Sequence, residues 1–340
     1  MNFGCSLRKL GGRVAMVVLA ATVSAIAPAQ TGDTDTGLLV ALRDVDQRLA
    51  TIAYRLATAN AALCRDLAPT PGWVVHAIDQ YDPAQASGVR QVFGFAGPVG
   101  IEAIVADGPA AMAGVRANDT LVAIDGKPVP KPSSATAQPS SATRDAVSAQ
   151  ISARPPTAPL KLTLLRERQR VIVTVPPSPG CRSAFEVLVG PDMTAGADGS
   201  IVQIGSRYFE RYTDAQIAVV VAHELAHNIL RHRARLDAAK VSRGVLSELG
   251  RNGRLFRRTE DDADLMGLHL LRNAGYDPAS APRFWRQHGG DIDGGLFRSR
   301  THASSKARAE ALEAEISRIP RDAPRPYHPP VLDTRDEPLR

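Results

Sequence analysis

Apolar residues recur at helical spacing near the start of the chain. Over residues 37–68 they return every four and then every three positions, at Leu38, Leu42, Val45, Leu49, Ile52, Leu56, Ala59 and Leu63. This spacing predicts an amphipathic helix with one apolar stripe. A coiled-coil dimer would use such a stripe. The repeat stops before Pro69 and Pro71, so we expect the helix to dock on the rest of the same chain.

Residues 88–178 have the pattern of a smaller, β-rich unit. Within residues 100–129, a short alternating strand, a Gly-Pro turn, a helix of small residues and a second strand ending in Asp-Gly follow one another. Residues 130–143 are rich in Pro, Ser, Ala and Thr, which is typical of a flexible insertion. One helix and a hairpin complete the unit.

Two further helices are predicted in the C-terminal half of the chain. Residues 213–232 form a strongly apolar helical pattern that starts with the Thr-x-x-Gln spacing of a capping box. Residues 255–274 form the second helix, and Gly275 is a natural stop for it. Residues 321–340 are predicted to be a proline-rich tail.

The first 29 residues have the pattern of an export signal. Three basic residues precede an apolar run over residues 14–27, and small residues follow up to Ala29. This order predicts a secretory signal peptide at residues 1–29, followed by a polar linker at residues 30–36. The protein would then be periplasmic or secreted. The alternative is an uncleaved segment that anchors the protein to the membrane, facing the periplasm.

Composition narrows the class of protein. Hydrophobic residues make up 44% of the 340 residues, which is ordinary for a globular protein and excludes wholesale disorder. No stretch reaches the roughly 18 uninterrupted apolar residues of a spanning helix, so we expect no transmembrane domain in the mature chain. The 41 basic residues, against 35 acidic ones, become 38 without the three in the signal. No basic patch is interleaved with aromatic residues, so we expect no nucleic-acid partner.

Two cysteines are left in the mature chain, Cys64 and Cys181. In an oxidising export compartment an even pair predicts a disulfide, which would join the end of the N-terminal helix to the start of the C-terminal domain. Two buried free thiols are the alternative.

The helix at residues 213–232 carries the motif His223-Glu224-Leu225-Ala226-His227. Side chains at positions i and i+4 lie on the same face of a helix, so both imidazoles can bind one zinc ion. Glu224, next to the first ligand, can reach a metal-bound water and act as general base. Zinc lowers the pKa of such a water towards about 7, which makes hydroxide available at neutral pH. The motif therefore predicts hydrolysis that depends on one zinc ion per chain.

A catalytic zinc ion is expected to have a third protein ligand. The zinc peptidases with a third histidine shortly after the motif are excluded, because positions 230 and 233 are Leu and Arg. Glu260 and Asp264 share a face of the second helix and offer another solution. Glu260 would be the third ligand, and Asp264 would bind the free nitrogen of a ligand histidine. The alternative is a solvated acidic face, since two more aspartates lie between them.

The β-rich unit resembles a bacterial PDZ domain. The resemblance rests on the run Gly-Pro-Ala-Ala-x-Ala-Gly-Val-x-x-x-Asp at residues 108–119 and on the strand after it. PDZ domains bind an extended peptide as an added strand and hold its C-terminal carboxylate. The resemblance therefore implies that a peptide C-terminus binds in a groove lined by Phe93, Gly94 and Phe95. A purely structural or docking module is the alternative.

Residues 181–320 resemble the HtpX-like and CAAX-prenyl-protease-like zinc metallopeptidases, metallopeptidase family forty-eight. The resemblance is carried by Glu260-x-x-Ala-Asp264 downstream of the His-Glu-x-x-His motif. It implies a mainly helical, gluzincin-type zinc metallopeptidase domain with a small β-sheet. Together with the N-terminal helix and the PDZ-like domain before it, this gives an α+β fold.

Two more expectations follow from this resemblance. His302, in a Thr-His pair that matches a segment of the family, would lie near the metal and assist or gate catalysis, although Ala303 replaces the family's proline. The strand around residues 200–204 would pair with an extended polypeptide substrate, because edge pairing reads the backbone rather than the sequence.

These observations together predict a zinc-dependent metalloendopeptidase that hydrolyses peptide bonds in exported proteins that are unfolded or misassembled. A non-proteolytic chaperone or PDZ scaffold is the first alternative. A site-2-type intramembrane protease is the second. That class needs its motif inside a spanning helix, whereas Asp214, Gln216, Asn228 and Arg231 flank the motif closely here.

Overall fold

The computed structural model describes residues 31–132, 138–241, 250–292 and 303–339, with side chains from residue 36 onward. The fold is α+β, with three separate sheets and the longest helices in the N-terminal segment and the C-terminal half. The predicted signal peptide at residues 1–29 and the predicted site residue His302 lie outside the described residues. Within the described residues, no helix is both long enough and apolar enough to cross a membrane.

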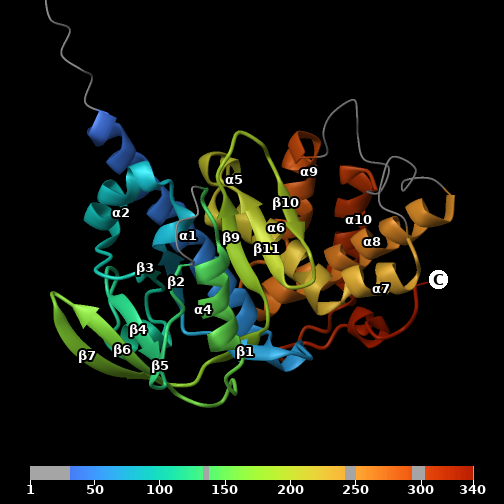
Figure 1. The fold of residues 1–340 in the computed structure, drawn as a ribbon. Coiled ribbons are helices and arrows are strands. Elements are labelled where there is room, and N and C mark those ends of the chain that lie inside the picture. The colour runs from blue at the N-terminus through green and yellow to red at the C-terminus, as the bar shows by residue number, and fades with distance from the viewer. Residues whose placement is uncertain (1–30, 133–137, 242–249, 293–302, 340) are drawn as a thin grey trace, which may run out of the picture.

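Helix α1 (Thr31–Ala59) runs between the two halves of the molecule, as Figure 1 shows in blue. Its stripe packs on the same chain, because Leu49, Ile52 and Leu56 lie in the core of the C-terminal half. The docking prediction is therefore confirmed. The helix begins earlier than predicted. Residues 31–36, which were expected to belong to a linker, form its first turns, because adding residues to an existing helix costs little free energy. The helix ends at Ala59 and a 3-10 turn, η1 (Ala61–Leu63), follows.

The PDZ-like half is an antiparallel sheet in the order β2-β3-β4-β6-β7, with β5 paired to β4. Its strands are β2 (Trp73–Ala77), β3 (Val99–Ile104), β4 (Thr120–Ile124), β5 (Lys127–Pro128), β6 (Leu160–Arg166) and β7 (Gln169–Val175). Its helices and 3-10 turns are η2 (Ile78–Gln80), η3 (Pro83–Gln85), α2 (Ala86–Phe93), α3 (Pro109–Met112) and α4 (Ala142–Ser152). The sheet begins at Trp73, earlier than the predicted start at residue 88. The predicted insertion at residues 130–143 includes undescribed residues, and its last two belong to α4.

The side chains predicted to line a peptide groove are buried. Phe93 and Phe95 are 0% and 3% exposed and pack in one apolar cluster with Leu39 of α1 and Val89 of α2. Gly94 ends α2 in the left-handed conformation. The prediction that Phe93, Gly94 and Phe95 form a peptide-binding loop is therefore wrong. These residues form a small core that docks α2 on α1, so a peptide has no access to the two aromatic side chains.

The C-terminal half surrounds a central helix, α6. A three-stranded sheet in the order β10-β11-β9 covers it on one side, and a two-stranded β1-β8 pair lies beside η1. The strands are β1 (Leu67–Pro69), β8 (Pro179–Cys181), β9 (Ala184–Leu188), β10 (Ala195–Ala197) and β11 (Ile201–Gly205). The helices and the last 3-10 turn are α5 (Arg207–Arg211), α6 (Asp214–Ile229), α7 (His232–Ala238), α8 (Gly250–Asn273), α9 (Ser280–Ile292), α10 (Ser305–Arg318) and η5 (Pro330–Thr334).

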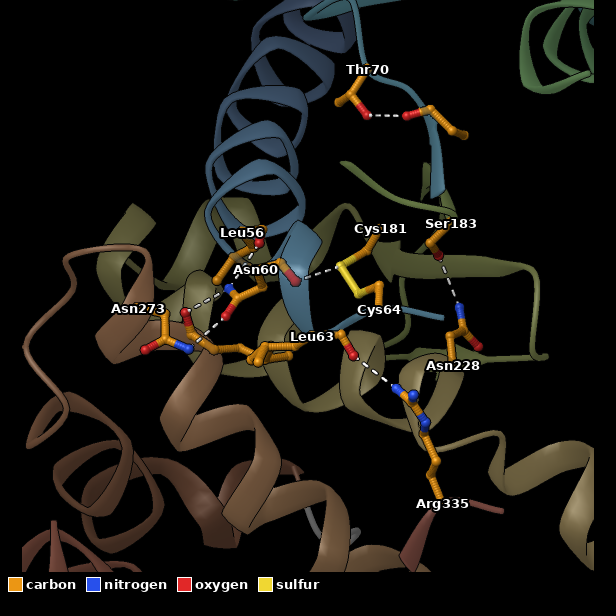
Figure 2. Close-up of a disulfide and its surroundings, with 12 residues drawn as sticks. Leu56, Asn60, Leu63, Cys64, Thr70, Cys181, Ser183, Asn228, Asn273 and Arg335 are labelled. Atoms are coloured by element: carbon orange, nitrogen blue, oxygen red, sulfur yellow. Dashed lines mark hydrogen bonds between the residues drawn. A yellow bond between two sulfur atoms is a disulfide. The ribbon is translucent and has the colours of Figure 1, made fainter. Parts of the chain in front are cut away.

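A disulfide and a side-chain hydrogen bond connect the segment after α1 to the later parts of this half. Cys64 and Cys181 form a disulfide with their Cα atoms 5.3 Å apart, so the predicted pairing is confirmed (Figure 2). The predicted tail is not loose. Leu332 in η5 is buried, and the Arg335 guanidinium donates to the carbonyl of Leu63 next to the disulfide (Figure 2).

Candidate metal centre

Helix α6 holds the His-Glu-x-x-His motif in the core. The backbone N–H of Thr213 donates to the Gln216 side chain, which closes the capping box predicted for the start of the helix. The helix is then apolar on nearly every side, so it is buried rather than lying on the surface. His223 is buried with it, whereas Glu224 and His227 are partly exposed. One face of the motif therefore opens towards solvent while the other is fixed by packing.

Helix α8 crosses α6 at very short range. A Cβ atom at Gly267 would lie only 3.2 Å from the Cα and backbone N of His223, so only glycine fits this crossing without displacing backbone. The close approach brings the middle of α8 over the motif. Glu260, two helical turns before Gly267, thereby reaches the two histidines. The structure thus places the predicted third ligand on the correct side of the motif.

Three ligand atoms converge at this crossing. The Nε2 atoms of His223 and His227 are 3.2 Å apart, and Glu260 Oε2 lies 3.2 Å from the first and 3.6 Å from the second. A tetrahedral zinc ion with bonds of about 2.0–2.1 Å separates its ligand atoms by roughly 3.3 Å. The three atoms therefore fit three corners of such a site, and the donor set of two imidazoles and a carboxylate suits zinc.

Asp264 orients the first histidine, as predicted. Its Oδ1 lies 3.0 Å from His223 Nδ1, which leaves Nε2 free to face the other two ligands. Burial alone would lower the pKa of His223, but its hydrogen bonds to Asp264 and Glu260 outweigh burial and raise that pKa to about 10. The site therefore favours an added positive charge at this position, which a metal ion would supply.

Arg308 of α10 holds Asp264 from the other side. Its Nε and Nη2 atoms donate to the two carboxylate oxygens at 2.7 and 2.6 Å, and its guanidinium stacks 3.3 Å from the centre of the Trp285 ring. Burial would raise the pKa of Asp264, but Arg308 and His223 lower it to about 2. Asp264 is therefore a fixed negative charge behind the ligand histidine.

His232 is a site residue that the sequence analysis did not identify. Its Nδ1 lies 2.9 Å from Nδ1 of His227, and its side chain is fully buried. Burial, helped by the charge of His227, lowers the pKa of His232 to about 2, so this imidazole is neutral. If His227 binds metal through Nε2, its Nδ1 carries the proton and donates it to His232. The only sequence signal was a third histidine five residues after the motif.

Replacing Arg308 with methionine tests this support. The change leaves the buried Asp264 carboxylate without its bidentate partner, so we expect the free energy of unfolding to fall by about 3–5 kcal/mol. Metal affinity should fall about 10–100-fold, because His223 loses its fixed orientation. Chemical denaturation and metal titration measure the two effects. The matched control is Arg318→Met, on an exposed arginine of the same helix, where a loss within about 1 kcal/mol is expected. Equal losses in both variants would contradict the assigned role.

Comparisons with known proteins agree with parts of this description. Residues 100–138 match the family model for the PDZ domain. The mitochondrial metalloendopeptidase OMA1 of Arabidopsis thaliana is 32% identical over 119 residues, which cover 29% of this chain and 24% of that protein. The protein of the same name from Schizosaccharomyces pombe is 31% identical over 135 residues, which cover 33% of this chain and 40% of that protein. The chain thus spans less than half the length of either relative.

Among solved structures, the HtrA-type protease AlgW with decapeptide is 22% identical, with a TM-score of 0.23, over 32% of this chain and 29% of that one. The chain therefore carries a PDZ domain, and about a third of its length is similar to mitochondrial metalloendopeptidases.

Proposed function

We propose that this protein is a zinc-dependent metalloendopeptidase of the gluzincin type, related to the HtpX-like family, with one catalytic zinc ion held by His223, His227 and Glu260. The observation that carries the proposal is the spacing of the three ligand atoms, 3.2 to 3.6 Å, on two helices that cross at a glycine. The similarity to two metalloendopeptidases supports the same reaction.

The side chains divide the work as follows. A bound zinc ion would polarise the scissile carbonyl and lower the pKa of a water at the site. Glu224, beside the first ligand and partly exposed, takes the proton from the attacking water and delivers it to the leaving amine. Asp264 and His232 hold the two ligand imidazoles in the tautomers that present Nε2.

The sheet suggests where an extended substrate lies. The expectation that residues 200–204 offer the pairing edge is wrong, because β11 is the central strand and both its edges are occupied by β9 and β10. The free edge on the β10 side is the better candidate. The turn after β10 is tied to α6, since the backbone N–H of Gly199 donates to the Asn228 side chain at 2.7 Å. Asn228 follows the second ligand histidine, so a substrate paired along β10 would pass beside the metal ligands.

Edge pairing requires an extended backbone, so we propose that the substrates are unfolded or misassembled polypeptides. With the export signal expected from the sequence, these would be proteins of the cell envelope, and the protein would act in their quality control. A PDZ scaffold without proteolytic activity is less well supported, since the aromatic residues expected in its groove are buried.

Removal of the metal tests the proposed reaction. We expect the purified protein to cleave a reduced and alkylated, and therefore unfolded, test protein and to spare the same protein when it is folded. A chelator should abolish cleavage, and zinc should restore it. Glu260→Gln protein should need far more zinc for any recovery, because one of three ligands is missing. Cleavage at the original rate by protein shown to be free of metal would contradict the proposal.

A further inference from the structure

A second group of metal-binding side chains lies buried between α1 and the PDZ sheet. Asp46 comes from α1, His76 from β2 and Glu102 from β3, and Figure 1 places these three elements side by side. The three residues are 7%, 8% and 0% exposed. Sequence reasoning gave no hint of this group, because its members are far apart in the chain and belong to no motif.

The geometry of this group parallels that of the proposed catalytic centre. His76 Nε2 lies 3.0 Å from Glu102 Oε2 and 3.5 Å from Asp46 Oδ2, and one ligand atom from each residue lies within 4.8 Å of the others. These separations bracket the roughly 3.3 Å expected between ligands of a tetrahedral first-row metal ion. One imidazole with two carboxylates is a donor set that suits zinc or manganese.

Within the described residues, no arginine or lysine donates a hydrogen bond to the free oxygens of these carboxylates, and His76 is a close polar neighbour of both. Both oxygens of Glu102 and Oδ2 of Asp46 are buried without a hydrogen-bond partner. Arg43 donates through Nη2 to the Val92 carbonyl and the Asn118 side chain, whereas its buried Nε has no hydrogen-bond partner, and Arg144 pairs with Glu186. Two buried carboxylates without such donors are costly, and coordination to a cation is one of the few ways to offset that cost.

The hydrogen-bond contacts of the His76 imidazole are compatible with metal binding through Nε2. Its Nδ1 contacts the Tyr81 hydroxyl, so a proton on Nδ1 can be donated there and Nε2 is left to face the two carboxylates. Two carboxylates and an imidazole buried at these distances need a positive partner, which is either a shared proton or a metal ion.

We propose that Asp46, His76 and Glu102 form a second, structural binding site for a divalent first-row metal ion such as Zn²⁺, which clamps α1 to the PDZ sheet. Helix α1 also packs on α6 and α8. The ion therefore fixes the PDZ domain relative to the helices that carry the other metal ligands. This proposal does not depend on the proposed peptidase activity.

Metal analysis of the full chain, loaded with zinc and then desalted, tests the proposal. We expect Glu102→Gln protein to hold one equivalent fewer than wild type, and the same drop in a Glu260→Gln background. The test compares the metal content with and without Glu102→Gln in the same background. The result therefore does not depend on whether the proposed catalytic centre holds metal. The matched control is Asp79→Asn, on a carboxylate of the same region that binds Thr143 and lies outside the group, and it should keep its metal. Equal metal content in Glu102→Gln and wild-type protein overturns the proposal in favour of a shared proton.

A thermal measurement covers the case in which Glu102→Gln does not fold. Glu260→Gln protein, stripped with a chelator and then given zinc or manganese, should melt several degrees higher than without metal. The same increase should be absent when Asp46→Asn is added, because this change removes a ligand at the α1 side only. No increase with either metal in the Glu260→Gln protein overturns the second site.

Discussion

Replacing Glu224 with glutamine should reduce peptide-bond cleavage by roughly 10²–10⁴-fold, the range that a positioned general base contributes. Glutamine has nearly the same shape but cannot accept the proton of the attacking water. Glu224 is not among the three atoms that converge on the proposed metal position, so the zinc content should stay at the wild-type level. Loss of activity with retention of metal is therefore the expected signature of its role.

The measurement pairs a cleavage assay on an unfolded protein with metal analysis of the same sample. Glu210→Gln is the matched control, since it makes the same substitution on an exposed glutamate of α5 that pairs with Arg207. This control should keep both activity and metal. If Glu224→Gln protein cleaves at the wild-type rate, the proposed mechanism is wrong. If it loses its metal, Glu224 acts in metal binding instead.

The centre around α6 could be predicted because its signals are local. The capping box at Thr213 and the spacing of His223 and His227 each lie within one or two helical turns, where periodicity fixes which side chains share a face. The same holds for Glu260 and Asp264. What joins the two pairs is the crossing at Gly267, and the sequence could only suggest it through resemblance.

His232 and Arg308 could not be assigned from the sequence in the same way. His232 reaches His227 only because Arg231 adopts a left-handed backbone conformation between α6 and α7, with φ of 56°. A left-handed turn at arginine has no reliable sequence signal. Arg308 reaches Asp264 from α10, across 44 residues of chain. Its role depends on how the helices pack, which periodicity within one helix does not determine.

The PDZ part shows how tertiary packing overrides a local pattern. Phe93 and Phe95 flank a glycine. A Phe-Gly-Phe sequence is compatible with an open binding loop and equally with a small buried core. Leu39 of α1 decides between them, because it joins the two rings in one buried cluster from more than fifty residues away. Strand β2 was missed for a related reason. Its five residues pair with β3 at the edge of the sheet and are too short to show a clear alternation of polar and apolar positions.

Removing the disulfide should have the largest effect on stability. Cys64 and Cys181 are 117 residues apart, and the segment between them contains the whole PDZ sheet. Closing a loop of about 100 residues lowers the entropy of the unfolded chain by an amount worth about 4–5 kcal/mol at room temperature. We therefore expect the Cys64→Ser, Cys181→Ser double variant to lose stability of this order in denaturant unfolding.

The loss of stability should be largest in the segments next to the disulfide. Figure 2 shows the disulfide below the end of α1, close to Asn60, whose side chain donates to the carbonyls of Leu56 and Leu270. The bond to Leu270 joins the end of α1 to α8, and so do the bond from the Asn273 side chain to the Asn60 side chain and the packing of Leu56 in the core. Hydrogen exchange should accelerate around β1 and β8, while the PDZ sheet, which has its own apolar core, should change little. Reduced wild-type protein is the control and should behave like the double variant. Equal stability of oxidised and reduced protein would mean that the packing of α1, and not the covalent bond, joins the two halves.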